Sequence, residues 1–235
     1  LRSHRGNERL IDFGDSALAN NVVLYFPLTT GQPSLWVSNN GSSSFITAPD
    51  PLPLNQWVHL AAVFTSPGGA AGTGSIFTNG VLAVSGSVKT PANVTRPSPL
   101  VGRSNTSSDK LADFRIDNLR IWSVARTAQQ LAEGMNNVYA AGTAGLLAQF
   151  QFSEEDGTTA NSSGVALDSS GNGRTMTLFN TTILPNKLTR PRFVETTAWV
   201  GQRLAPPVGE SASTLDLSYL AGSINQTYGA AHSVT

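Results

Sequence analysis

Short runs of apolar and β-branched residues, separated by Gly, Pro and Asn, fill the first two-thirds of the chain. Residues 21–28, 34–38 and 44–47 are of this kind, and such runs predict short β-strands. The strongest run, residues 54–66, carries mainly apolar side chains on both of its alternating faces. We therefore expect both faces of that strand to be covered, as in the middle of a two-layer sandwich.

A β-hairpin is predicted over residues 74–84. There Asn79 and Gly80 separate two apolar runs, and these residue types tolerate the positive φ that both positions of a tight hairpin turn need. Residues 114–123 form a further alternating run, which predicts another strand. The pattern as a whole predicts an all-β fold of short strands and frequent turns.

One short helix is predicted after the last of these strands. Thr127 is suited to the N-cap position, Gln130 completes a capping box three residues on, and Gly134 can end the helix. Leu131 and Met135 are four residues apart, so both side chains would lie on one side of the helix and pack on the sandwich.

The pattern changes after residue 137. Residues 145–152 predict a strand, residues 154–173 a loop and residues 174–179 a second short strand. From residue 184 the sequence is irregular and interrupted by Pro. The predicted organisation is a β-sandwich domain at 1–137, a small β-rich extension at 138–205 and an irregular C-terminal linker or extended tail at 206–235.

Composition narrows the class of protein further. Charged residues make up 13% of the 235 residues, against ~25% in a typical soluble domain, and 15 Lys and Arg balance 15 Asp and Glu. Since nucleic acids and anionic membranes attract basic surfaces, neither is an expected partner. The absence of Cys excludes disulfides and thiolate chemistry. No apolar run is long enough to cross a membrane, so we expect no membrane insertion.

Six Asn-x-Ser/Thr sequons make N-glycosylation a candidate modification. Most of them fall in predicted turns, where a glycan would be tolerated, although a chain so rich in Ser and Thr carries some by chance. Together with the low charge, they favour a secreted, extracellular or cell-surface location. The candidate acceptors are Asn40, Asn93, Asn105, Asn161, Asn180 and Asn225.

Several motifs in a fixed order resemble one family. They are residues 55–64 (NQWVHLAAVF), 77–83 (FTNGVLA), 101–122, which ends in FRIDNLRIW, and 125–131 (ARTAQQL). This combination resembles the LamG-like jelly roll of the concanavalin A-like lectin/glucanase superfamily, to which laminin G modules and pentraxins also belong. The resemblance covers residues 9–137 and implies an antiparallel β-sandwich of the jelly-roll type.

The resemblance also implies a jelly roll that is incomplete at its start. The family's opening strands have no counterpart before Arg9, so an earlier segment, another copy or residues 145–179 would have to fill their place. Residues 145–180 resemble the piece that opens the next jelly roll in tandem members of the family. A larger, multi-module parent protein is therefore expected.

Catalysis is not expected, although glucanases share this fold. A retaining glycosidase needs two carboxylates about 5–5.5 Å apart, which on a strand means two acids on the same face. The main acidic cluster, residues 154–156 (EED), stands in a predicted turn, and consecutive residues point in alternate directions. The three His residues are too scattered to hold a metal, and His59 is expected to be a hydrogen-bonded residue in or near the core.

Calcium is the one cofactor that the chain suggests, because sandwich loops supply the oxygen ligands that it binds. The resemblance implies a structural calcium ion at Asp117. The alternative, favoured by the missing opening strands, is that Asp117 caps a turn or pairs with Arg115 or Arg120. The other candidate ligands are Asp12 and Asp15, followed by Asp168 with Asn172, whose loop DSSGNG is more typical of a hydrogen-bonded turn.

A sugar site would need exposed aromatic side chains beside polar loop residues. Trp57 and Trp122 occupy positions that the family uses for packing, whereas Trp36 and Trp199 are less constrained. The residues that bind a ligand stay unknown at this stage. The sequence thus predicts a non-catalytic extracellular adhesion or assembly module of a larger surface or filament protein, whose partners are other copies or modules of the same assembly. The alternative is a lectin-like module that binds glycans, with or without calcium.

Overall fold

The computed structural model describes residues 1–14, 19–106, 108–152 and 165–177. By its internal contacts the chain divides into two units, and each is described by itself. Unit 1 comprises Leu1–Arg115 and Ala125–Met135, and unit 2 comprises Ile116–Val124 and the chain from Asn136 onward. The predicted boundaries at residues 137 and 205 stay predictions, and the predicted tail lies outside the described residues.

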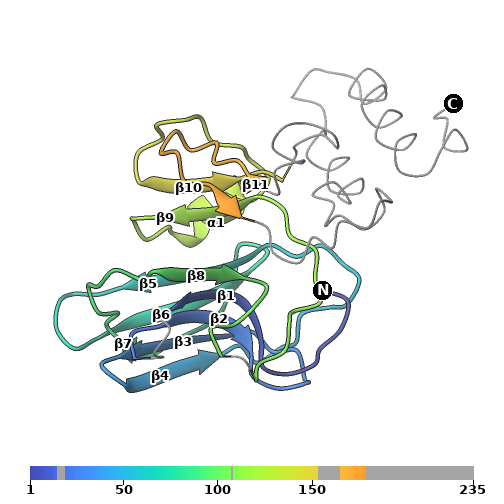
Figure 1. Ribbon diagram of the computed structural model, residues 1–235, viewed down its shortest axis with the longest axis vertical. Coiled ribbons are helices and arrows are strands. Elements are labelled where there is room, and N and C mark those ends of the chain that lie inside the picture. The colour runs from blue at the N-terminus through green and yellow to red at the C-terminus, as the bar shows by residue number, and fades with distance from the viewer. Residues whose placement is uncertain (15–18, 107, 153–164, 178–235) are drawn as a thin grey trace, which may run out of the picture. The chain divides into compact units, whose positions relative to one another are not determined.

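Unit 1 contains a five-stranded antiparallel sheet. It includes the three strands predicted from the first apolar runs, together with two strands that the sequence did not predict, β1 and β8 (Figure 1). Across the sheet the strands are β4 (Ser42–Thr47), β3 (Ser34–Asn39), β2 (Val22–Phe26), β1 (Glu8–Gly14) and β8 (Ser98–Val101).

The second sheet of unit 1 has three antiparallel strands, β5 (Leu60–Thr65), β6 (Ala71–Thr78) and β7 (Val81–Lys89). The predicted hairpin is confirmed as β6 and β7. Its turn residues Asn79 and Gly80 have φ of 51° and 79°, the region that Asn and Gly tolerate best. The Asn79 side chain also accepts a hydrogen bond from the backbone N–H of His59 at 2.9 Å, which ties the turn to the start of β5.

The core of unit 1 lies between these two sheets. Leu35, Val37 and Ile46 from the five-stranded sheet meet Ile76 and Val88 from the three-stranded sheet, and all five are buried. Leu35 and Val37 are two residues apart on β3, so the residue between them, Trp36, lies on the outer face of the sheet. The architecture is the predicted all-β sandwich of antiparallel sheets.

The strand predicted over residues 54–66 is shorter than expected and lies elsewhere in its sheet. A turn at residues 54–56, in which Asn55 has a φ of 57°, delays the strand until Leu60. β5 then lies at one end of the three-stranded sheet, not at its centre, and its side chains are half-buried or exposed. Phe64 still packs on the core, and Trp57 lies half-buried ahead of the strand.

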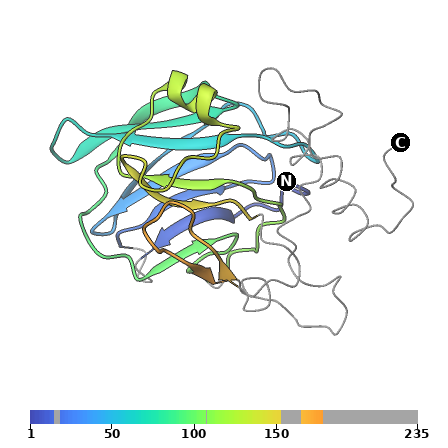
Figure 2. The same cartoon turned by 90° about the horizontal axis from the view of Figure 1, so that it is seen from above.

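The predicted helix is confirmed as α1 (Ala128–Gly134). The Thr127 hydroxyl accepts a hydrogen bond from the backbone N–H of Gln130 at 3.2 Å, and the Gln130 side chain accepts one from the backbone N–H of Thr127 at 3.0 Å. This capping box satisfies two donors that the first turn would leave unpaired. α1 lies against β7 (Figure 2). A side chain at Gly80 would collide with Ala132 of the helix.

Unit 2 pairs β9 (Leu119–Trp122) with β10 (Leu146–Phe150) and β11 (Val165–Ala166) with β12 (Met176–Thr177). Its core is formed by Ala148, Phe150, Phe152 and Ala166, on which Ile116, Leu119 and Ile121 pack. The predicted strand at 145–152 is thus present, and it folds back on β9. The strand predicted at 114–123 is limited to β9, and β11 interrupts the predicted loop. Among the described residues, no helix is long and apolar enough to span a membrane.

Candidate functional site

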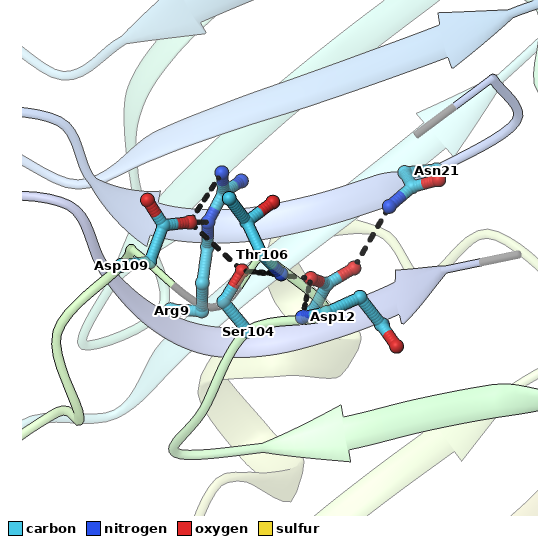
Figure 3. Close-up of polar contacts among 7 residues, drawn as sticks. Arg9, Asp12, Asn21, Ser104, Thr106 and Asp109 are labelled. Atoms are coloured by element: carbon cyan, nitrogen blue, oxygen red, sulfur yellow. Dashed lines mark hydrogen bonds and ion pairs between the residues drawn. The ribbon is translucent and has the colours of Figure 1, made fainter. Parts of the chain in front are cut away.

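A network of buried polar residues lies on the outer face of the five-stranded sheet (Figure 3). Asp12 points outward from β1 and is fully buried. Its carboxylate accepts hydrogen bonds from the side-chain amide of Asn21 at 3.2 Å and from the backbone N–H of Asn105 at 3.1 Å. Both contacts bring distant loops onto β1.

Arg9, on the same face of β1, forms an ion pair with Asp109. The Arg9 Nε and Nη2 atoms both lie 2.9 Å from Asp109 Oδ2, and the two side chains are only 13% and 9% exposed. Ser104 donates a hydrogen bond to the same carboxylate at 2.8 Å and accepts one from the backbone N–H of Thr106 at 2.8 Å. The loop that follows β8 is therefore fastened to β1 through a shielded charge pair.

Aromatic side chains continue this face toward β4. The Arg9 guanidinium carbon lies 4.9 Å from the ring centre of Tyr25 and 5.8 Å from that of Trp36, within cation–π range. Burial raises the pKa of Tyr25, with Asp109 acting in the same direction and Arg9 in the opposite one. Phe45, directly opposite Trp36 in the register, is 63% exposed.

The surroundings of Asp12 do not fit a calcium ion. Its two carboxylate oxygens accept hydrogen bonds from N–H groups of Asn21 and Asn105, which present hydrogen atoms and not the oxygen lone pairs that calcium requires. Among the described residues, no group of three or more Asp, Glu, His or Cys lies close enough together to hold a metal. The second candidate of this pair, Asp15, lies outside the described residues.

Asp117 lies in unit 2, just before β9. Its carboxylate accepts a hydrogen bond from the backbone N–H of Asn118 at 2.8 Å, as in the predicted turn cap. Burial lowers the pKa of Arg120, and the nearby Tyr139 and Asp117 oppose that shift. Both side-chain polar atoms of Asn118 are buried without a hydrogen-bond partner in the described part of the chain. A cation at Asp117 could thus gain a second oxygen ligand, although Arg120 would weaken its binding.

The loop DSSGNG is a hydrogen-bonded turn in the structure. The Asp168 carboxylate accepts hydrogen bonds from the backbone N–H groups of Gln149, Ser170 and Arg174 at 2.9–3.0 Å and from the Ser170 hydroxyl. Burial alone would raise the pKa of Asp168, but these hydrogen bonds together lower it. Asn172 donates to the backbone of β10, so this loop holds β10 in place and its donors leave little room for calcium.

The sequons fall into three groups. Asn40 and Asn93 are exposed, which is the exposure that a glycan needs. Asn105 is half-buried and donates its backbone N–H to Asp12, so it offers less room for a glycan than the two exposed acceptors. Asn161, Asn180 and Asn225 lie outside the described residues, as does the acidic cluster at 154–156.

Sequence analysis did not identify the pair of Arg9 and Asp109 or the exposure of Phe45. The available signal was alternation: Trp36 stands between Leu35 and Val37 in β3, and Phe45 precedes Ile46 in β4, while these aliphatic neighbours face the core. No comparable signal links Arg9 to Asp109, because they meet only through the pairing of β1 with β8.

The two antiparallel sheets of unit 1 form a β-sandwich, and the ion pair of Arg9 and Asp109 lies on the outer face of its five-stranded sheet. Such a sandwich defines a module of the jelly-roll class. The chain belongs to the concanavalin A-like lectin/glucanases superfamily, which matches residues 1–132 and confirms the predicted family. Among solved structures it is similar to an S-layer domain-containing protein from Clostridium thermocellum ATCC 27405, with 20% identity and a TM-score of 0.26. That match covers 57% of this chain and 65% of the other. No curated protein matches the chain.

Replacing Asp109 with Asn should destabilise unit 1. The substitution leaves the guanidinium of Arg9 shielded from water but without its counter-charge, which typically costs about 3 kcal/mol. We expect a loss of that size in the free energy of unfolding, measured by urea denaturation. The exposed Asp50 provides a control, since Asp50→Asn should change it by less than about 0.5 kcal/mol. Equal effects of the two substitutions would contradict a stabilising role for the pair.

Asp168 should make the stability of unit 2 depend on pH in acid. Because its pKa is lowered in the folded state, its stabilising contribution is complete above the ordinary carboxyl pKa of about 3.9 and is lost as the pH falls through the folded value. Thermal unfolding followed between about pH 5 and pH 2 should show a steeper loss in the wild type than in Asp168→Asn. Parallel curves for the two proteins would refute this contribution.

Proposed function

We propose that the chain is a non-catalytic adhesion or assembly module of a larger surface or filament protein, acting outside the cell. The observation that carries this proposal is that the buried acids form hydrogen bonds within the protein. Glu8 and Asp12, the fully buried acids among the described residues, both accept hydrogen bonds from the protein. Glycoside hydrolysis instead needs two carboxylates that face bound substrate.

The edges of the sheets support assembly with other copies or modules. β4 and β8 end the five-stranded sheet, and β5 and β7 end the three-stranded sheet. A strand at the end of a sheet offers backbone groups to which a strand from another module can add. β5 is the best suited of these, because its apolar side chains Leu60, Val63 and Phe64 are only half-buried, so a strand from another module could bury them further.

A lectin-like module is the second candidate. The observation that favours it is the exposure of Phe45 beside Trp36, since an aromatic ring next to polar groups is what a sugar site requires. The two candidates are compatible, because a surface module can bind glycans and assemble at the same time.

Sedimentation velocity over a range of protein concentrations tests the assembly proposal. We expect the full chain to sediment faster as its concentration rises, and we expect incubation with β-glucans to release no reducing sugar. A chain that stays monomeric throughout would oppose assembly, and hydrolysis of any β-glucan would refute the non-catalytic part. Each result stands independently of the other.

We further propose that a calcium ion binds weakly at Asp117, with the amide oxygen of Asn118 as a second ligand. The resemblance to calcium-binding jelly rolls and the unpartnered amide of Asn118 support this site. Because Arg120 lies close by, the affinity should fall in the weak range of extracellular modules, with Kd on the order of 0.1–1 mM.

Calcium at ten times its Kd should stabilise the folded chain by about 1.4 kcal/mol. We therefore expect 5 mM calcium, used with a chelator as the reference, to raise the melting temperature of the wild type. Asp117→Asn should abolish the increase, whereas Asp50→Asn should retain it. An increase of the same size in Asp117→Asn, or none in the wild type, would exclude calcium at this residue.

A further inference from the structure

Three Asn-Gly pairs occur in the chain, at residues 40–41, 79–80 and 172–173. Each is a candidate for deamidation, a reaction in which the backbone nitrogen of the glycine attacks the side-chain carbonyl carbon of the preceding Asn. Glycine favours this attack, because it has no side chain to shield its nitrogen and its backbone is the most adaptable of all residues. The folded structure decides which of the three pairs can reach the geometry of the attack.

Asn79 is held on both sides of its turn. Its backbone N–H donates to the carbonyl of His59 at 2.8 Å, and its side-chain oxygen accepts from the backbone N–H of His59 at 2.9 Å. Gly80 is buried against α1, where Ala132 lies too close for a side chain to fit. Attack by the Gly80 nitrogen would therefore require this turn to separate from the start of β5 and from the helix.

Asn172 is held through its side-chain nitrogen. This nitrogen donates to the backbone carbonyls of Leu146 and Leu147 at 2.9 and 3.0 Å and lies 3.1 Å from the hydroxyl of Ser170. It is the atom that deamidation releases as ammonia, so the reaction would have to break the contacts that fasten this loop to β10. We therefore expect Asn172 to react slowly.

Asn40 stands at the exposed turn that joins β3 to β4. Nothing lies within 4 Å of the position that a side chain at Gly41 would take. The turn is positioned through its backbone: the N–H of Asn40 donates to the side chain of Asn20 at 3.0 Å, and that of Gly41 to the carbonyl of Ala19 at 2.9 Å. The Asn40 side chain itself has no hydrogen-bond partner in the described part of the chain.

This turn is the easiest of the three to open. For the Gly41 nitrogen to attack, its N–H must leave Ala19 and the turn must change from its present shape, in which Asn40 and Gly41 have φ of 50° and 77°. Backbone hydrogen bonds at the surface oppose that movement, and β4 is the end strand of its sheet. Exposed turns open more readily than turns fastened to neighbouring elements.

We infer that Asn40 is a site of spontaneous deamidation. The Gly41 nitrogen loses its proton to hydroxide and bonds to Cγ of Asn40, and the side-chain nitrogen takes up a proton and leaves as ammonia, which closes a succinimide ring. Water then opens the ring at either carbonyl to give aspartate or isoaspartate. Both products add a negative charge to a chain whose net charge is zero, and isoaspartate also lengthens the main chain of the turn by one carbon.

Asn40 is also a candidate glycan acceptor, through the same side-chain nitrogen. A glycan there would cover the turn and would have to leave together with that nitrogen, so the inference applies to the chain without a glycan at Asn40. It does not depend on the assembly or the lectin-like proposal.

The test uses the full chain, produced in bacteria without glycans and incubated in mildly alkaline buffer. Peptide mass spectrometry follows deamidation at the three pairs, in the folded chain and in a parallel sample unfolded in guanidinium chloride. We expect similar rates at all three pairs in the unfolded chain, whereas in the folded chain Asn40 should react at least about tenfold faster than Asn79 and Asn172. The reaction should release ammonia in step with the product and should slow in mildly acidic buffer, because the attacking nitrogen must lose a proton.

Asn40→Gln is the matched control, because its longer side chain would have to close a larger ring, which forms far more slowly. The folded variant should keep its amide at residue 40 and should react at Asn79 and Asn172 as slowly as the wild type does. Absence of reaction at Asn40 over the time in which the unfolded chain reacts would overturn the inference. Equal rates at the three pairs in the folded chain would overturn it as well, because the structure would then not select Asn40.

Discussion

The alternation of side chains on β3 and β4 is the constraint on which the rest of unit 1 depends. Leu35, Val37 and Ile46 must face the opposing sheet to be removed from water, and that requirement leaves no choice about where their neighbours point. Trp36 and Phe45 are outside for this reason alone. A shift of one residue in the register would exchange the core with the outer face, so the core and the proposed binding surface are specified together.

A β-bulge creates a difficulty that the loop after β8 resolves. β1 lies between β2 and β8, and the bulge between Arg9 and Ile11 places Arg9 and Asp12, three residues apart, on the same outer face. Charges shielded by neighbouring chain are costly unless paired, and here Asp109 and Asn105 supply the partners. The acids of this face are thereby committed to holding loops in place.

The elements that the sequence predicted correctly are those with local causes. The hairpin at Asn79 and Gly80 and the capping box at Thr127 depend on residues within a few positions of each other. The strand at 54–66 was placed wrongly because its apolar pattern indicates burial on two faces but carries no information about its neighbours, and it lies at the end of its sheet. β1 was missed because a β-bulge between Arg9 and Ile11 interrupts its alternation.

By itself, therefore, the sequence determined the all-β class, the family, the hairpin and the helix, because strand alternation and turn chemistry act over short stretches of chain. It also excluded cysteine chemistry outright. Only the tertiary structure decided which aspartates have partners and which rings face solvent. Arg9 and Asp109 are a hundred residues apart, and the exposure of Phe45 depends on which strands lie beside it. Such pairings arise from the packing of the sheets and leave no local pattern in the chain.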